Sequence, residues 1–323
     1  MNRMTVLALN SLPHRNATVA LLLVWLMSGG YSYNRHGWRE YGARSRPCGD
    51  KRRSSFSATS MCFAALGLLP GAARAEVSEL VLGVAPLLDE AETRAHFQPL
   101  CNYLTAITRL PCRVGTTPNF LSYWETMRQG KDYNLILDEA HFTDYRVQKM
   151  NYTVLAKIPD TVTYSLIVPR NTKWDDPARL AGRRIATLGI PSMGAAQLNG
   201  LFPKAAKQPI IVEVDSAAYG LALLSAAKVA AAILPTPLVR EEIVRGAPLR
   251  VLLSTVPLPH MAVSAAPGIG PELRRSLRLA LLNANQNDAG RSMLARIGIE
   301  RFDPANATVY KGQARILQEY WGY

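Results

Sequence analysis

The feature that most restricts the fold is a regular alternation of short apolar runs with longer segments of helical periodicity. Between residues 79 and 157 the pattern reads strand, helix, strand, helix, strand, helix, strand, beginning with the nearly continuous apolar run at 79–85. Strands that alternate with helices in this way form mostly parallel sheets covered by helices on both faces. The sequence therefore predicts an α/β fold.

Helix boundaries can be read from the residues that commonly begin and end helices. Asp89 is a candidate N-cap for a helix in which Phe97, Leu100 and Leu104 recur on one face. A second helix is expected over residues 119–129, ended by Gly130, and a third near residues 144–150. These helices would connect the strands of a first sheet.

The strand–helix pattern then restarts at residue 163 and continues to about residue 253, after which the last 50 residues are mainly helical. Extended segments near 158–163 and 255–259 join the two blocks, which predicts two lobes linked by a double crossover. One lobe comprises residues 76–160 and 258–323, and the other residues 161–257. This organisation is typical of venus-flytrap binding proteins, whose lobes close on a ligand.

Residues 51–75 have the three parts of a secretory signal peptide. A basic cluster at 51–53 precedes an apolar stretch, and Ala73-Arg74-Ala75 provides small residues at the cleavage positions. We expect cleavage after Ala75 and a mature protein in the periplasm. Residues 1–50 are expected to be untranslated or disordered.

The net charge of +13 is unevenly distributed along the chain. Residues 1–75 carry a net charge of +8, which leaves +5 for the remainder. The basic excess therefore belongs mainly to the leader, and we do not expect a nucleic-acid partner. No apolar run reaches the roughly 18–20 residues that a membrane-spanning helix needs.

Two cysteines, Cys101 and Cys112, lie within the expected mature chain. In an oxidising compartment such a pair can form a disulfide worth about 2–3 kcal/mol. The alternative is two buried thiols. We favour the disulfide.

The mature chain has no recognisable catalytic constellation. Its histidines are His96, His141 and His260, and it lacks HExxH, CxxC, GxSxG and P-loop motifs. We therefore expect neither an enzyme nor a bound cofactor.

The most informative local feature is the loop at 188–196, LGIPSMGAA, which follows a strand and opens a helix. The unpaired amides and the positive end of the dipole at such a helix start can hold an anion. Ser192 can cap the helix or donate a hydroxyl, and Gly194 would allow an anion to approach closely. An ordinary capped connection between strand and helix is the alternative.

The order and spacing of several short motifs carry a resemblance to a known family. These motifs are VLGVAP at 81–86, FQPL at 97–100, MRQG at 127–130, LAGRRIA at 180–186, the 189–195 loop, and a C-terminal AG…L…IG…F pattern at 289–302. Residues 79–323 thereby resemble the periplasmic phosphate/phosphite/phosphonate-binding proteins of ABC importers. The resemblance implies the type II periplasmic binding protein fold, a small anionic ligand, an ABC permease as partner and no catalysis.

The resemblance also implies ligand-binding positions. The family's Ser-Thr-Ser-Gly loop corresponds to Pro191-Ser192-Met193-Gly194, so only one hydroxyl and the glycine are retained. An acidic residue expected near 229–232 and a histidine expected near 216 are absent, which argues against an amino-phosphonate. The full candidate set for ligand binding is Ser192, Met193, Gly194, Ala195, Tyr123, Asp138, His141 and Pro86.

Other readings of these residues stay open. His141, His260, Met193 and Met261 form a nitrogen and sulfur set that would suit copper if they converged. His141 beside Asp138 or Glu139 would suit a pH-sensitive gate. The leading hypothesis is a monomeric solute-binding protein for a small oxyanion, without a resident metal; the alternative is a sensory module that signals to a membrane kinase.

Overall fold

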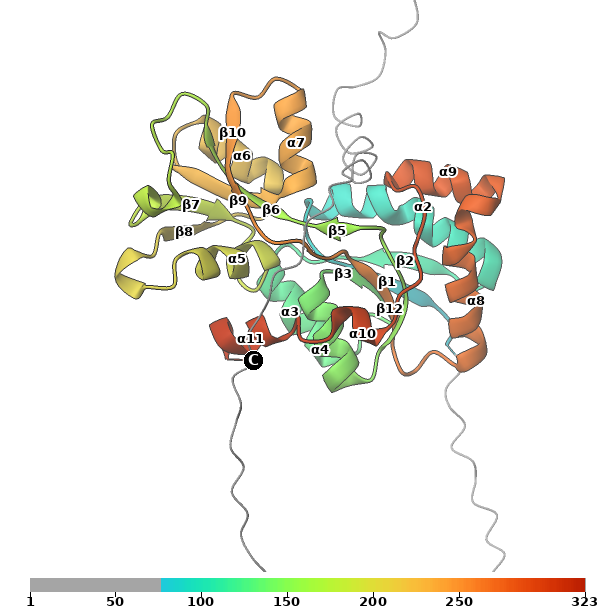
Figure 1. The fold of residues 1–323 in the computed structure, drawn as a ribbon. Coiled ribbons are helices and arrows are strands. Elements are labelled where there is room, and N and C mark those ends of the chain that lie inside the picture. Colours follow the sequence, from blue (N-terminus) through green and yellow to red (C-terminus); the bar gives the residue numbers. More distant parts are fainter. Residues whose placement is uncertain (1–76, 323) are drawn as a thin grey trace, which may run out of the picture. The chain divides into compact units, whose positions relative to one another are not determined.

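The computed structural model describes residues 77–322 (Figure 1). The predicted signal peptide and the residues before it lie outside this range. None of the helices within residues 77–322 combines the length and apolar character needed to cross a bilayer.

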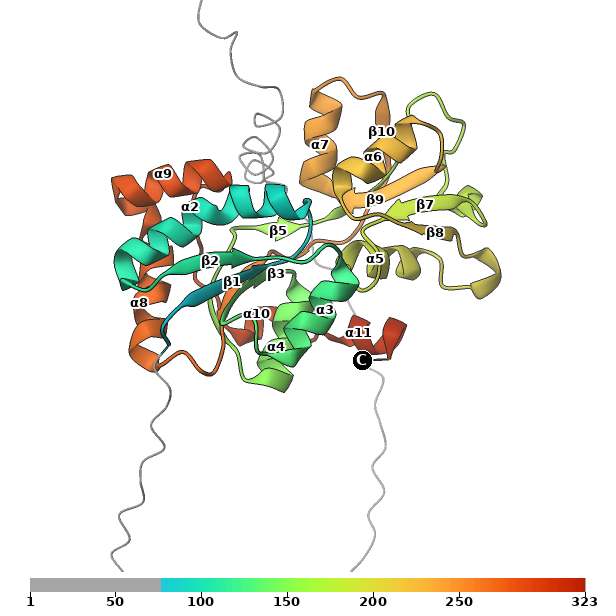
Figure 2. The ribbon, with the colours of Figure 1, turned by 180° about the vertical axis from the view of Figure 1, so that it is seen from behind.

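The first of two five-stranded sheets has the strand order β2-β1-β3-β12-β4. Its strands are β1 (Leu80–Val84), β2 (Cys112–Gly115), β3 (Leu135–Asp138), β4 (Thr153–Lys157) and β12 (Ala262–Ala265). Helices lie on both sides of it, with α2 and α9 above the strands and α3, α4 and α10 below them in Figures 1 and 2. These helices are α2 (Glu90–Thr108), α3 (Phe120–Gln129), α4 (Ala140–Met150), α8 (Pro271–Leu282), α9 (Asp288–Ile297) and α10 (Ala307–Tyr310).

The second sheet has the strand order β10-β6-β9-β7-β8. Its strands are β6 (Tyr164–Pro169), β7 (Arg184–Thr187), β8 (Ile210–Glu213), β9 (Ala231–Pro235) and β10 (Leu249–Ser254). Its helices are α5 (Met193–Leu201), α6 (Ala217–Ser225) and α7 (Thr236–Val244). Below, the first half means the residues built on the first sheet, and the second half those built on the second sheet.

The chain passes between the halves twice, and the passages pair with each other. β5 (Thr161–Val162) and β11 (Leu258–Pro259) form a short antiparallel ribbon. The C-terminal helix α11 (Arg315–Trp321) contacts both α4 of the first half and α5 of the second. The ribbon and α11 are thus three chain segments at the boundary.

Each sheet is mixed, with one strand running against the other four. The reversed strands are β12 in the first sheet and β6 in the second, and each is the first strand of its sheet after a passage. A strand that enters its sheet from the boundary must run away from it. The four remaining strands of the first sheet, and β7, β8, β9 and β10 of the second, therefore end at the boundary.

Local capping follows the sequence closely. The Asp89 side chain accepts a hydrogen bond from the backbone N–H of Glu92 at 2.8 Å, and Gly130 adopts the left-handed conformation that ends α3. The prediction for α4 was less accurate, because this helix begins at Ala140 rather than near residue 144. Its N-cap, Glu139, makes no capping bond with its own helix, because its side chain is engaged elsewhere.

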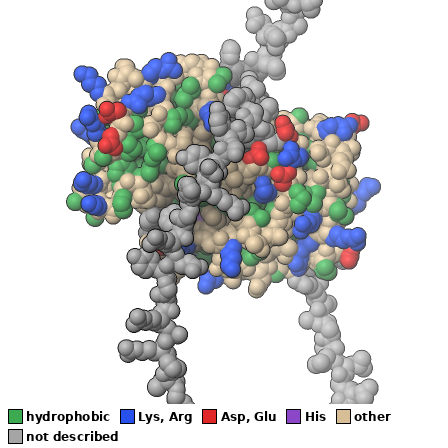
Figure 3. Space-filling model, in the orientation of Figure 1, with side chains coloured by type: hydrophobic (Ala, Val, Ile, Leu, Met, Phe, Trp, Pro, Cys, Tyr) green, Lys and Arg blue, Asp and Glu red, His purple; other side chains and the backbone are tan. Residues whose placement is uncertain are grey.

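Charged side chains are dispersed on the face shown in Figure 3. Lys and Arg lie scattered over both halves among acidic and apolar side chains. This face of the described residues therefore lacks the continuous basic strip that nucleic-acid backbones attract.

Candidate functional site

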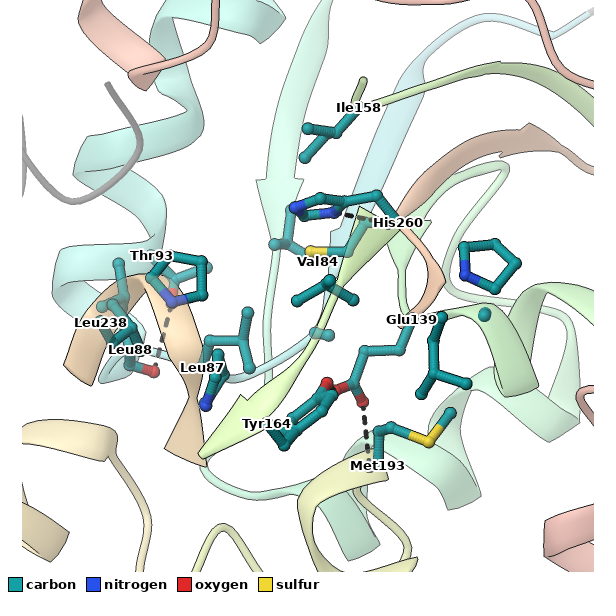
Figure 4. A pocket seen from close by; sticks show the side chains of 18 of the residues that line it. Val84, Leu87, Leu88, Thr93, Glu139, Ile158, Tyr164, Met193, Leu238 and His260 are labelled. Atoms are coloured by element: carbon teal, nitrogen blue, oxygen red, sulfur yellow. Dashed lines mark hydrogen bonds between the residues drawn. The ribbon is translucent and has the colours of Figure 1, made fainter. Parts of the chain in front are cut away.

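A cavity of about 80 Å³ lies where the strand ends of the two halves meet (Figure 4). We call it the junction cavity. Open α/β sheets characteristically bind ligands at the carboxyl ends of their strands, so the fold itself favours this place. The lining residues are Val84, Ala85, Leu87, Leu88, Thr93, His96, Phe97, Glu139, Ala140, Ile158, Val162, Tyr164, Met193, Pro235, Pro237, Leu238, Leu258, Pro259, His260 and Met261.

The walls of the junction cavity are mainly apolar, and among the described lining residues only Glu139 has a side chain that carries a formal charge near neutral pH. Thr93, His96, Tyr164 and His260 are the other polar side chains, and neither Lys nor Arg is among the lining residues. An anion in this space would therefore meet no cationic side chain from residues 77–322.

Glu139 joins the two halves across the cavity. Its Oε1 accepts a hydrogen bond from the Tyr164 hydroxyl, and its Oε2 accepts one from the backbone N–H of Met193 at 3.4 Å (Figure 4). Met193 is the first residue of α5. The helix start that the sequence indicates as an anion site thus already faces a carboxyl group of the protein itself.

Burial governs the protonation of Glu139. Loss of hydration raises its pKa to about 7, and the nearby Asp138 acts in the same direction, whereas the bonds from Tyr164 and Met193 oppose the rise. Near neutral pH the carboxyl group is therefore divided between its neutral and ionised forms.

His141, in the first turn of α4, makes a second bond between the halves. Its Nε2 lies 2.8 Å from the Pro191 carbonyl oxygen, which can only accept, so Nε2 carries the proton. Burial lowers the pKa of His141 to about 3 and keeps the ring neutral. This side chain does not line the junction cavity.

Asp138 faces the interior of the first half. Arg146 donates to both carboxylate oxygens of Asp138, with Nη2 2.6 Å from Oδ1. The hydroxyls of Tyr123 and Thr143 also donate to Asp138, at 2.8 and 3.1 Å. All four side chains are buried, and none lines the cavity. This arrangement is a closed ion-pair cluster.

The 191–195 loop is also largely occupied by internal contacts. The Ser192 hydroxyl accepts from the Ala195 N–H at 3.2 Å and so acts as the N-cap of α5. A Cβ placed on Gly194 would lie 3.2 Å from Thr187 Oγ1, so the space left by this glycine is used for packing inside the second half. Of this loop, only Met193 lines the cavity.

His260 has one ring nitrogen without a partner among the described residues. Its Nδ1 accepts from the Met261 N–H at 2.8 Å, while Nε2 is buried and unbonded. Burial lowers the pKa of His260 to about 3, and the positive charge of Lys157 acts in the same direction. The ring is therefore a neutral donor on the cavity wall.

His96 has a structural bond. Its Nε2 donates to the Ile297 carbonyl at 3.1 Å, which ties α2 to the end of α9, and burial lowers its pKa. Within residues 77–322 no three His, Cys, Asp or Glu side chains gather in an arrangement that could hold a metal ion. Met193, His260 and Met261 do line one cavity, but His141 is held by Pro191, so the set considered for copper does not converge.

The chain matches the family model described as "ABC transporter, phosphonate, periplasmic substrate-binding protein" over residues 82–310. The chain belongs to this family. Its members bind substrates and are not catalytic, in agreement with the expected lack of an enzyme active site. No curated protein sequence matched the chain.

Solved structures show the type II periplasmic binding protein fold of this family member. It is similar to PhnD1 from Prochlorococcus marinus in complex with methylphosphonate, with 16% identity, 76% of this chain and 99% of that chain covered, and a TM-score of 0.66. It is also similar to a Xanthomonas citri protein bound to ATP, with 17% identity, 75% of this chain and 98% of that chain covered, and a TM-score of 0.63. A binding protein component of an ABC phosphonate transporter from Pseudomonas aeruginosa is similar with 14% identity, 76% of this chain and 85% of that chain covered, and a TM-score of 0.61.

The site residues proposed for this phosphonate-binding family member are distributed over several environments. Met193 lies on the cavity, whereas Ser192, Gly194 and Ala195 lie behind it in α5 and its cap. Tyr123 and Asp138 belong to the ion-pair cluster, His141 to the contact with Pro191, and Pro86 is buried beside the cavity wall without lining it.

Sequence reasoning did not assign Glu139 and His96 to the ligand site. The sequence places Glu139 in the run 138–142 at the end of a predicted strand, where open α/β sheets bind ligands, and pairs it with His141, but the predicted ligand-binding set leaves it out. His96 had the spacing of a helix interior and gave no signal of a cavity.

The two cysteines are free thiols in this structure. Cys101 is buried, and hydrogen bonding to the Cys112 thiol, together with burial, raises its pKa. The two sulfurs therefore lie within interaction distance, and the disulfide stays a prediction.

Proposed function

We propose that this chain is the extracytoplasmic solute-binding component of an ABC importer and that it captures a small ligand in the junction cavity. In this proposal residues 76–160 with 258–323 form one lobe and residues 161–257 the other. The lobes close about the β5–β11 ribbon, and the loaded protein docks on a permease in the inner membrane. A signal peptide cleaved after Ala75 would deliver the chain to the periplasm.

One observation carries this proposal: the junction cavity is built from both halves. Val84 and His96 come from the first half, Tyr164 and Met193 from the second, and Leu258 from the ribbon that joins them. A ligand held there contacts both lobes and the hinge at once, which is how a ligand shifts such a protein towards its closed state.

The oxyanion predicted from the sequence is the alternative occupant of this site. The first N–H of α5 supports this alternative, because it already donates a hydrogen bond to an acidic group, the carboxyl group of Glu139. A phosphonate would have to replace Glu139 there and find its other donors without a Lys or Arg side chain on the cavity wall.

A thermal-shift comparison tests whether the junction cavity is the ligand site. The wild type and a Leu88→Trp variant, in which a large ring fills the cavity from the half-buried Leu88 position, are compared. The panel comprises methylphosphonate, phosphate, phosphite, sulfate, thiosulfate, Cu²⁺ and dimethyl sulfoxide. A ligand at a concentration of 100 times its dissociation constant adds about 2.7 kcal/mol to the free energy of unfolding of the wild type.

The expected result is stabilisation of the wild type and none of Leu88→Trp. Leu121→Trp, at an exposed position on α3, is the matched control and should respond like the wild type. A compound that stabilises the wild type and Leu88→Trp equally would place ligand capture outside the cavity and contradict the proposal.

A further inference from the structure

The junction cavity contains one polar group whose hydrogen-bonding capacity is unused. His260 Nε2 is the only lining side-chain atom in residues 77–322 that is buried without a hydrogen-bond partner. A buried donor without an acceptor is destabilising, because it loses its hydrogen bonds to water and gains none in return. Such a group is a common mark of a place where a ligand completes the bonding.

The tautomer of His260 is fixed by its backbone. Because Nδ1 accepts from the Met261 N–H, the ring proton must lie on Nε2. Figure 4 shows the bonded edge of the ring turned towards its own backbone and the opposite edge turned into the cavity. The cavity therefore presents one neutral N–H donor.

The surroundings of this donor are unsuited to a charged ligand. Most lining side chains are aliphatic, aromatic or proline, and the carboxyl group of Glu139 is already bonded to Tyr164 and Met193. A dianion would be desolvated beside an acidic group and without a cationic partner, which is costly in a medium of low dielectric constant. A neutral ligand avoids this penalty.

The size of the cavity limits the ligand further. At about 80 Å³ it has roughly half the volume, about 150 Å³, of an apolar cavity known to bind benzene. In the arrangement described here the cavity therefore accommodates a molecule smaller than a benzene ring.

We propose that the junction cavity binds a small neutral molecule, mainly apolar, with one hydrogen-bond acceptor that receives the His260 Nε2–H. This inference rests on the proposed function, because it names the ligand class for the same cavity. It replaces the small oxyanion expected from the sequence with a neutral ligand recognised by shape and by a single hydrogen bond.

A pair of probes separates the hydrogen bond from simple filling of the cavity. Dimethyl sulfoxide has two methyl groups and a strong acceptor, whereas dimethyl sulfide keeps the methyl groups and has only a weak acceptor. Dissociation constants are measured by ligand-detected NMR on the full chain for the wild type, for His260→Phe, which keeps a ring but removes the donor, and for Leu88→Trp.

The expected result is that His260→Phe weakens dimethyl sulfoxide binding about tenfold, the effect of one neutral hydrogen bond, and leaves dimethyl sulfide binding within about twofold. Leu88→Trp abolishes both. Should His260→Phe fail to fold, ¹⁵N-histidine spectra of the wild type give the same test: the Nε2 resonance shifts with dimethyl sulfoxide and not with dimethyl sulfide.

Three results would overturn the inference. The first is no binding of dimethyl sulfoxide at millimolar concentration, and the second is an equal loss of affinity for both probes in His260→Phe. The third is binding of methylphosphonate that Leu88→Trp abolishes; this outcome would refute the neutral ligand class and leave ligand capture by the cavity intact. If no compound of either panel binds in a manner sensitive to Leu88→Trp, both proposals fail.

Discussion

Two consecutive acidic residues at the end of β3 have opposite surroundings. Asp138 is enclosed by the first half and held by the Arg146 guanidinium and two hydroxyls. Glu139 points to the cavity and meets a phenol and a peptide N–H of the second half, with no cation among its hydrogen-bond partners. Successive side chains alternate in direction along extended backbone, which separates the two environments within one residue.

The comparison shows that burial alone does not decide what a carboxyl group does. Both side chains are almost completely removed from solvent. Asp138 is paired with the buried Arg146 guanidinium and fixes α4 against the sheet, whereas Glu139 keeps a pKa near neutrality and connects the two halves. The first arrangement suits a permanent structure and the second a contact that can be remade.

The largest expected effect comes from removing the partner of Asp138. Arg146→Met leaves a buried carboxylate without its cation, and we expect a loss of about 3–5 kcal/mol in the free energy of unfolding, measured by urea denaturation at pH 7. The double variant Asp138→Asn with Arg146→Met should recover part of this loss. A loss below about 1 kcal/mol for Arg146→Met would contradict the closed cluster.

A smaller effect, dependent on pH, is expected at Glu139. Its folded pKa of about 7 exceeds the ordinary 4.5, so between these values the folded state holds a proton that the unfolded state has released. The contribution of this bound proton to the free energy of unfolding is complete below pH 4.5. It is lost as the pH rises to about 7, and the total change is about 3 kcal/mol.

Glu139→Gln cannot lose this proton. The stability of the wild type minus that of Glu139→Gln, from urea denaturation at pH 5, 6, 7 and 8, should therefore fall with rising pH and level off above pH 7. The buried histidines also make stability depend on pH, but their protonation contributes equally to both proteins and cancels in the difference. A difference that does not change with pH would show that Glu139 has an ordinary pKa.

The smallest effects are expected from removing the two tyrosine hydroxyls that donate to these carboxyl groups, Tyr123 to Asp138 and Tyr164 to Glu139. Tyr123→Phe removes a bond to a carboxylate paired with Arg146 and should cost about 1.5–3 kcal/mol at both pH 6 and pH 8. Tyr164→Phe removes a bond to Glu139, which is mostly neutral at pH 6, and should cost about 1 kcal/mol there and more at pH 8. Equal losses for Tyr164→Phe at the two pH values would remove the distinction between the acids.

Much of the fold follows directly from the sequence. The apolar runs predicted the strands, and Asp89, Asn119 and Gly130 marked helix ends that the structure reproduces. The reversed directions of β6 and β12 could not be read from composition, because an apolar run gives no strand direction. That information comes from the passages between the halves, which only the tertiary arrangement reveals.

The site was less predictable for a physical reason. The sequence places Asp138, Glu139 and His141 at a strand end, but it does not show which of these side chains faces the interior and which faces the cavity. An error of one residue reverses that assignment, and the predicted start of α4 is four residues later than the observed start at Ala140. The apolar cavity walls, such as Leu88 and Leu238, look like ordinary core residues in sequence. Polar motifs therefore drew attention to the α5 loop, whose polar groups are mostly used for its own folding.

The position of α11 makes the protein suitable for optical measurement. Trp321 is partly exposed and lies in the helix that contacts α4 and α5, whereas Trp124 is enclosed in α3. A displacement of one half against the other that moves α11 should therefore alter the polarity around the Trp321 indole. Intrinsic emission, with Trp321→Phe as the reference that keeps only the signal of the other tryptophans, should thus record domain movement in real time without an attached dye.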